Sequence, residues 1–358
     1  MANYTYIHIP FCKQKCKYCS IISYSCLEKI DQYFIALEKE IDFIYSGETL
    51  KTLYFGGGTP SLLNYKYIKR LINKFNINFD TEITIELNPD DVFKDYLKKL
   101  KDIGINRLSI GAQTFNDEVL KLIGRRHSAM QTINAIKLAQ DVGFNNISLD
   151  LIYGLPNANI NLDLKEIIKL NVQHISTYGL KIEKESYFGK YKPKNLPDDD
   201  SQADMYLTIN DFLEKNGYKR YEISNFAKEG FESKHNLNYW NNNEYYGFGL
   251  SAHGYLNGIR YSNFTDFEKY FEFPTKHYNE NVQTKEEVLE EEIFLGFRKE
   301  VGINIEKINK KFNIDFDKKY IKILKKFIPK YIQKTDVGYK LTLDGVLLSN
   351  IILSEFLQ

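Results

Sequence analysis

Features common in exported, membrane-spanning or nucleic-acid-binding proteins are missing from this chain of 358 residues. It has no run of about 18 apolar residues, so no transmembrane helix is expected. The opening stretch MANYTYIHIP lacks the basic segment and apolar core of a secretory signal. The formal net charge is only +1, which gives no global attraction to nucleic acid or to an anionic membrane. We therefore expect a cytoplasmic protein that binds no nucleic acid and meets a membrane at most peripherally.

Cysteine is also scarce, and the four cysteines lie close together near the start of the chain. A disulfide framework would spread its cysteines, whereas a cluster favours metal binding in a reducing compartment. Three of them follow the spacing Cys12-x-x-x-Cys16-x-x-Cys19. Three thiolates on one loop can ligate three irons of a [4Fe–4S] cubane and leave the fourth iron for a bidentate small molecule. The alternative is a zinc site with Cys26 or His8 as a further ligand.

Short β-branched or aromatic runs alternate with longer helical patterns through the first two thirds of the chain. The expected strands are residues 4–9, 52–55, 82–87, 107–110, 147–152, 174–180 and 221–224. The expected helices between them are residues 29–45, 65–75, 93–103, 117–123, 129–142 and 203–216. Alternation of this kind predicts an α/β fold with parallel strands, built as a full or partial (β/α) TIM-type barrel.

The pattern divides the chain into three parts. Residues 1–225 form the expected barrel, and residues 226–283 form an aromatic, Asn-rich connecting region. Residues 284–358 carry helical patterns at 285–299, 305–312 and 317–327, a hairpin at 331–342 and a last helix. We interpret this last part as a small, mainly helical, winged-helix-like domain.

Chemically distinctive residues recur where the expected strands end. Cys12 follows the first strand, GGGT at 56–59 follows the second, Glu86 ends the third, Gln113 follows the fourth and Asp150 lies within the fifth. Active sites of β/α barrels form at the C-terminal ends of the strands, so these residues should converge on one site. The glycine run fits neither G-x-G-x-x-G nor the Walker pattern, which excludes those nucleotide-phosphate motifs.

Taken together, these stretches resemble the radical SAM superfamily, in its coproporphyrinogen oxidase-like branch, and come closest to the HemW heme chaperones. The resemblance is carried, in chain order, by YIHIPF at 6–11, the cysteine loop, GGGTPS at 56–61, IELNPD at 85–90, LSIGAQTFN at 108–116, GRRH at 124–127, SLDLIYGLP at 148–156 and GYKLTLDGVLLSN at 338–350. It implies that Cys12, Cys16 and Cys19 hold a [4Fe–4S] cluster that binds S-adenosylmethionine (SAM). One electron from such a cluster cleaves the sulfonium and yields a 5′-deoxyadenosyl radical.

The resemblance also implies a polar shell around SAM. The matching positions are Tyr6, Gly57, Gly58, Thr59, Glu86, Gln113, Arg125 and Asp150. The guanidinium of Arg125 suits the SAM carboxylate because it can bind bidentately. Glu86 and Asp150 can accept hydrogen bonds from ribose hydroxyls or from the SAM ammonium group.

The run HNLNYW at 235–240 resembles the heme-binding motif H-N-x-x-Y-W of the HemW chaperones. The resemblance implies that His235, Asn236, Tyr239 and Trp240 bind heme. Histidine and tyrosine can ligate heme iron, and Trp240, the only tryptophan, can stack on a porphyrin. The alternative is an aromatic core segment with one hydrogen-bonded histidine. His253, a little further along, is either a second iron ligand or a structural residue.

Three functions stay open at this point, the third of which is some other radical SAM reaction on a tetrapyrrole. The first is a heme chaperone that passes heme to an acceptor apoprotein, such as a respiratory protein; the resemblance is compatible with a homodimer. The second is oxygen-independent coproporphyrinogen III oxidation by radical decarboxylation. The oxidase branch carries a cysteine where this chain has Ile21, and a longer segment before its tyrosine. We therefore favour the chaperone and expect no oxidase activity.

Overall fold

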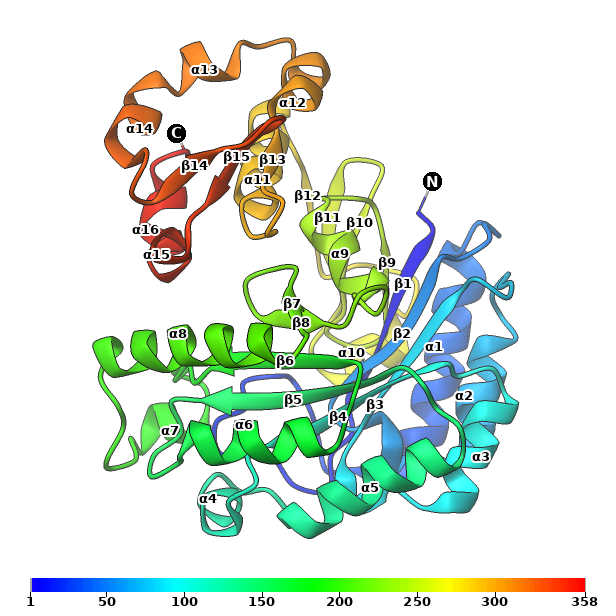
Figure 1. Ribbon diagram of the computed structural model, residues 1–358. Coiled ribbons are helices and arrows are strands. Elements are labelled where there is room, and N and C mark those ends of the chain that lie inside the picture. Colours follow the sequence, from blue (N-terminus) through cyan, green and yellow to red (C-terminus); the bar gives the residue numbers. More distant parts are fainter. Residues whose placement is uncertain (1, 358) are drawn as a thin grey trace.

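A nine-stranded sheet forms the centre of the computed structural model, which describes residues 2–357. The strand order is β7-β8-β6-β5-β4-β3-β2-β1-β9. Six neighbouring strands run parallel: β1 (Tyr4–Ile9), β2 (Thr52–Gly57), β3 (Glu82–Leu87), β4 (Arg107–Gln113), β5 (Ile147–Tyr153) and β6 (His174–Gly179). The two edge strands do not pair with each other, so the barrel is partial (Figure 1). This confirms the predicted α/β fold of TIM-like type.

Helices connect the parallel strands and cover the outside of the sheet (Figure 1). They are α1 (Ile30–Ile44), α2 (Tyr65–Ile72), α3 (Lys94–Asp102), α4 (Asp117–Leu122), α5 (Ala129–Asp141), α6 (Ile160–Lys169), the short α7 (Tyr187–Lys190) and α8 (Asp199–Lys215). Polar caps set several of their starts; Ser128, for example, forms a capping box with Gln131 at the start of α5. Strand residues such as Ile85 and Leu108 are fully buried under these helices, so apolar burial holds the two layers together.

The region after α8 contributes to both edges of the sheet. β7 (Lys219–Arg220) and β8 (Asn225–Ala227) form a short hairpin, and β8 runs antiparallel to β6. The predicted strand at 221–224 is wrong, because these residues form the connection of that hairpin. β9 (Tyr246–Phe248) pairs with β1 at the other edge.

Further elements of this region precede or follow β9. They are α9 (Lys234–Trp240), β10 (His253–Leu256), β11 (Ile259–Ser262), α10 (Phe267–Glu272) and β12 (Asn279–Val282). β10, β11 and β12 form a separate antiparallel sheet.

The last part of the chain forms a lobe of its own, drawn in orange and red in Figure 1. Its elements are α11 (Lys285–Gly296), β13 (Ile303–Asn304), α12 (Ile305–Phe312), α13 (Phe316–Lys319), α14 (Ile321–Phe327), β14 (Ile332–Lys334), β15 (Gly338–Leu341), α15 (Leu343–Leu347) and α16 (Ser349–Ser354). Phe297, Phe316 and Phe356 are buried in its core. The helix expected at 317–327 is divided at Tyr320, where the backbone leaves helical geometry. Within residues 2–357, no helix combines the length and apolar character needed to cross a membrane.

Candidate cofactor site

A cavity of about 470 Å³ opens at the C-terminal ends of the parallel strands. It is lined by the three thiols of the cysteine motif and by seven of the eight residues predicted to bind SAM: Gly57, Gly58, Thr59, Glu86, Gln113, Arg125 and Asp150. Tyr6, the eighth, is not among the lining residues. The predicted convergence is therefore observed for residues that come from five different strands or the loops after them.

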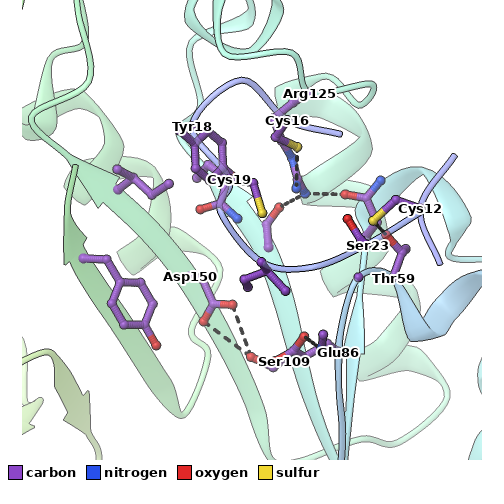
Figure 2. A pocket seen from close by; sticks show the side chains of 18 of the residues that line it. Cys12, Cys16, Tyr18, Cys19, Ser23, Thr59, Glu86, Ser109, Arg125 and Asp150 are labelled. Atoms are coloured by element: carbon purple, nitrogen blue, oxygen red, sulfur yellow. Dashed lines mark hydrogen bonds between the residues drawn. The ribbon is translucent and has the colours of Figure 1, made fainter. Parts of the chain in front are cut away.

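The cysteine loop is tied to its surroundings through backbone hydrogen bonds. Cys12 N donates to Tyr24 O at 2.9 Å, and Lys17 N donates to Ile123 O at 2.9 Å. The thiols are free and partly exposed. Within residues 2–357, no three His, Cys, Asp or Glu side chains converge as ligands of one metal ion, and the three thiols are spread along the loop (Figure 2). Burial raises the pKa of the Cys19 thiol, although nearby Lys15 opposes this effect.

The glycine run brings the end of β2 against the base of the cysteine loop. Gly58 N donates to Ile9 O at 2.9 Å, and a Cβ at Gly58 would lie only 2.6 Å from Phe11 O. Gly57 has φ of +115°, which side chains with a Cβ rarely adopt. This close approach places Thr59 Oγ1 3.3 Å from Cys12 Sγ (Figure 2). The glycines therefore position the cysteine loop as well as leaving backbone open to a ligand.

Two carboxylates lie deep in the cavity. Glu86 Oε2 accepts a hydrogen bond from Gly57 N at 3.0 Å, and Oε1 accepts one from Tyr54 Oη at 2.9 Å. Ser109 Oγ donates to Asp150 at 3.3 Å (Figure 2). Burial, followed by the charge of Asp150, raises the pKa of Glu86 to about 7. Burial also raises the pKa of Asp150. In the ionised form, both carboxylates can accept hydrogen bonds from hydroxyl or ammonium donors, and a bound ammonium group would lower the pKa of each.

Three arginines line the cavity, and the sequence argument identified only Arg125 as a binding residue. Arg126 forms ion pairs with Asp90 and Asp91. Arg125 donates to Gly111 O at 2.7 Å and to Asn88 Oδ1, while its Nη1 lies 3.7 Å from Cys16 Sγ. Its guanidinium therefore faces the cysteine loop (Figure 2). Arg107, at the start of β4, lines the cavity and is 2% exposed. Its charge partly opposes the rise in pKa that burial causes at Glu86 and Asp150. Arginine is scarce in this chain, and that scarcity is the only sequence signal for Arg107.

Orphaned polar atoms indicate that this cavity suits a polar ligand. The Nε atoms of Arg107 and Arg125 are buried without a hydrogen-bond partner in the described structure. Buried donors of this kind are normally satisfied by protein, water or ligand. The cavity offers carboxylates to hydroxyl and ammonium groups, guanidinium groups to a carboxylate, and three thiolates to iron. SAM and a [4Fe–4S] cluster together require these groups.

Gln113 is the last residue of β4, three residues later than the predicted strand end. The pairing with β5 shifts register between Gly111 and Gln113, and Gln113 has φ of +69°. A β-bulge with a side chain in the left-handed region is a costly arrangement that turns a residue out of the ladder. Gln113 lines the cavity together with the alternate residues Arg107, Ser109 and Gly111 of the same strand.

Helix α9, which carries the predicted heme motif, lies at the opposite ends of the strands. The carboxylate of Glu82, the first residue of β3, accepts from Lys234 N and His235 N at 3.2 Å each. His235 Nδ1 lies 2.7 Å from Thr52 Oγ1, at the start of β2, and Nε2 lies 2.9 Å from Tyr239 Oη. The ring is 1% exposed, and burial lowers its pKa to about 3. In this arrangement His235 has no free nitrogen for iron.

The other motif residues face in different directions. Asn236 reaches the cofactor cavity, and Tyr239 lines two other cavities. The Nε1 atom of Trp240 is buried without a partner in the described structure, and the guanidinium of Arg298 lies 5.7 Å from the Trp240 ring centroid. The motif is therefore part of the packing between the barrel and the C-terminal lobe.

Tyr6 lies behind the cavity. Its ring stacks on that of Tyr54 with the centroids 6.0 Å apart, and its hydroxyl lies 3.1 Å from His8 Nδ1. Tyr54 in turn stacks on His235 at 4.8 Å. Tyr6 therefore belongs to an aromatic stack that joins the cofactor cavity to α9.

Comparison with known families and proteins agrees with this geometry. The radical SAM superfamily matches residues 6–170, and the HemN C-terminal domain matches residues 283–348. The heme chaperone HemW of Lactococcus lactis is 41% identical over 89% of this chain and 87% of its own. HemW of Bacillus subtilis is 38% identical over 98% of both chains. Among solved structures, the coproporphyrinogen III oxidase HemN of Escherichia coli superposes with a TM-score of 0.87 at 26% identity, covering 99% of this chain and 90% of that one.

A partial barrel with three cysteines on the loop after its first strand is the architecture of a protein that holds a [4Fe–4S] cluster with SAM. Membership of this class decides between the two metal sites that the cysteine spacing allows: the loop holds a [4Fe–4S] cluster and not zinc. The chain belongs to the radical SAM superfamily and, within it, to the family of the HemW heme chaperones.

Proposed function

We propose that this protein is a heme chaperone that binds heme and passes it to an acceptor apoprotein. The observation that carries the proposal is the similarity to a HemW heme chaperone over 98% of both chains. The cofactor cavity supports it, because the cysteine loop and seven of the eight residues predicted to bind SAM line it together. The acceptor remains to be identified, and respiratory apoproteins are the first to test. The thiols need a reducing compartment, which supports a cytoplasmic location.

The residues of the cavity have separable tasks in this proposal. Cys12, Cys16 and Cys19 would hold the cluster, and Arg125 would balance the charge of the cysteine loop beside Cys16. Glu86 and Asp150 would accept hydrogen bonds from SAM. When bound, the cluster and SAM supply one-electron chemistry, and the protein keeps SAM exchangeable because the cavity opens to solvent along the cysteine loop.

A second candidate is coproporphyrinogen III oxidation. It is favoured by the TM-score of 0.87 to the HemN oxidase. Against it stands Ile21, which lines the cavity and is 49% exposed, where the oxidase branch carries a further cysteine. An exposed isoleucine has no acid–base or redox chemistry to offer at that position.

Anaerobic reconstitution of the cluster followed by two parallel assays separates the two functions. In the first, hemin is added, the absorption spectrum is recorded and the loaded protein is mixed with a heme-free b-type cytochrome. In the second, coproporphyrinogen III is incubated with SAM and a reductant. We expect about one heme per chain, transfer to the apocytochrome and no protoporphyrinogen. Oxidase product without a stable heme complex would replace the chaperone by the oxidase. Size-exclusion chromatography of the same samples tests the homodimer.

A further inference from the structure

The six histidines of the chain differ in whether a ring nitrogen is free to bind a metal. Five of them use a ring nitrogen in a hydrogen bond: His8, His127, His174, His235 and His277. The sixth, His253, begins β10 and is exposed. Within the described part of the chain, its ring has no hydrogen-bond or ion-pair partner. A ligand to iron needs a free nitrogen lone pair. His127 Nδ1 and His277 Nε2 also have no hydrogen-bond partner in the described structure, but both atoms are buried, so His253 alone offers an unpaired nitrogen that is accessible.

His253 lies at an open cavity of about 320 Å³. One wall is aromatic: the rings of Tyr239 and Tyr245 meet edge to face with centroids 4.7 Å apart. Ile21 and Ile22, from the segment directly after the cysteine motif, also line the cavity. None of the lining residues is Asp, Glu, Lys or Arg. An uncharged lining that combines aromatic and aliphatic side chains with polar groups offers a planar, aromatic ligand contacts that a small ion cannot use.

The backbone beneath His253 is held firmly. Gly247 in β9 lies so close that a Cβ there would be 1.8 Å from His253 O. Ala252 N donates to Gly249 O at 3.0 Å, and Ala252 O accepts from Asn263 N at 2.9 Å. Ser251 has φ of +65°, a conformation that costs free energy and recurs at ligand sites. The backbone that carries the exposed imidazole is thus preorganised, which favours ligand binding.

We propose that His253 is an axial ligand of heme iron, and that the cavity between Tyr239 and Ile21 receives the porphyrin. The assignment rests on the proposed heme-chaperone function and specifies where the cargo binds. A single imidazole is too few for zinc, which takes at least three protein ligands. Heme iron already has four nitrogen ligands from the porphyrin and needs only axial ones.

The size and location of this cavity fit a protein that releases its cargo. A volume of about 320 Å³ lies at the lower limit of sites that enclose a small molecule, roughly 300–1,000 Å³. The porphyrin would therefore be covered in part, and its open edge would remain accessible to an acceptor. Ser20 and Ile21, beside Cys19, bring the cluster loop next to the heme.

The test compares the cluster-loaded wild type with His253→Ala, His253→Gln, His235→Ala and the matched control His277→Gln. Each protein is titrated anaerobically with hemin, and axial ligation is read from absorption and electron paramagnetic resonance spectra. We expect both His253 variants to lose more than about tenfold in affinity, as removal of metal-site groups commonly causes 10–100-fold losses. They should also lose the histidine-ligated spectrum, and added imidazole should restore it in His253→Ala. His277→Gln should match the wild type.

The outcomes are distinguishable. A wild type that takes up no hemin would refute the chaperone function and this assignment with it. A wild type that binds hemin with an unchanged spectrum in both His253 variants would refute only the assignment. A spectrum lost in His235→Ala and kept in His253→Ala would transfer the ligand role to the motif histidine. Cluster content and circular dichroism show whether each variant is folded.

Discussion

Glu40 in α1 is fully buried, and its carboxylate joins α1 to the segment that carries His253. Gly249 N donates to Oε2 at 2.9 Å, Tyr270 Oη donates to Oε2 at 2.6 Å, and Asn263 Nδ2 donates to Oε1 at 2.6 Å. Burial nevertheless raises its pKa from 4.5 to about 7. We predict that Glu40 makes the protein less stable as the pH rises, and that Glu40→Gln removes this dependence.

The magnitude follows from the linkage between protonation and folding. A group whose pKa is higher in the folded state binds more protons there, so the free energy of unfolding falls as pH rises above 4.5 and levels off above about 7. With these pKa values, the contribution of Glu40 to the free energy of unfolding falls by about 2.5 kcal/mol between pH 5 and pH 8. The amide introduced by Glu40→Gln cannot ionise, so the variant should gain about that much relative to the wild type over the same interval.

Urea unfolding at pH 5 and pH 8, followed by the fluorescence of the single tryptophan, measures this difference. Other buried carboxyls titrate in both proteins and cancel in the comparison. Asp42→Asn on the same helix is the matched control, because its exposed ion pair with Lys74 should contribute less than about 1 kcal/mol. A Glu40→Gln effect of equal size at both pH values would refute the reasoning, since the carboxyl would then not titrate between them.

Three further predictions concern the cofactor cavity. Gly58→Ala should destabilise the protein by about 1–3 kcal/mol through overpacking against Phe11 O, and should lower cluster content as measured by iron and sulfide analysis; full iron content would contradict the proposed close approach. Cys16→Ser should lose most cluster iron while Cys26→Ser keeps it, and equal losses would invalidate the cysteine assignment. Glu86→Gln should weaken SAM binding about tenfold in equilibrium dialysis, the effect of losing roughly 1.4 kcal/mol; unchanged binding would remove Glu86 from the SAM site.

The local sequence pattern was sufficient to predict the parallel core of the fold. The strands expected at 4–9 and 82–87 coincide with β1 and β3, and the helix expected at 305–312 coincides with α12. These segments have strong periodicity or β-branched runs, which is the information that a single sequence carries best. The cofactor cavity followed from the same pattern, because strand ends of a parallel barrel must meet.

The elements and contacts that the sequence pattern did not predict depend on tertiary contacts. β7, β8 and β9 have only two or three residues each and exist because they pair with established strands. Arg107 begins a strand, just before the stretch at 108–116, and its electrostatic effect on Glu86 and Asp150 depends on the folded barrel. The partner of His235, Thr52, is 183 residues away in sequence, and no local spacing reveals that the motif histidine is enclosed.

The aromatic stack connects the two ends of the barrel and changes how motif substitutions should be interpreted. Tyr54 donates to Glu86 in the cofactor cavity at 2.9 Å and stacks on His235 in α9 at 4.8 Å. Removing the His235 ring would leave Thr52 Oγ1 and Tyr239 Oη without a partner and open a void beside Tyr54, each at a cost in stability. Loss of heme in such a variant can therefore follow from disturbed packing alone. Only the ligand signature of the bound iron separates a residue that holds heme from one that holds the barrel around it.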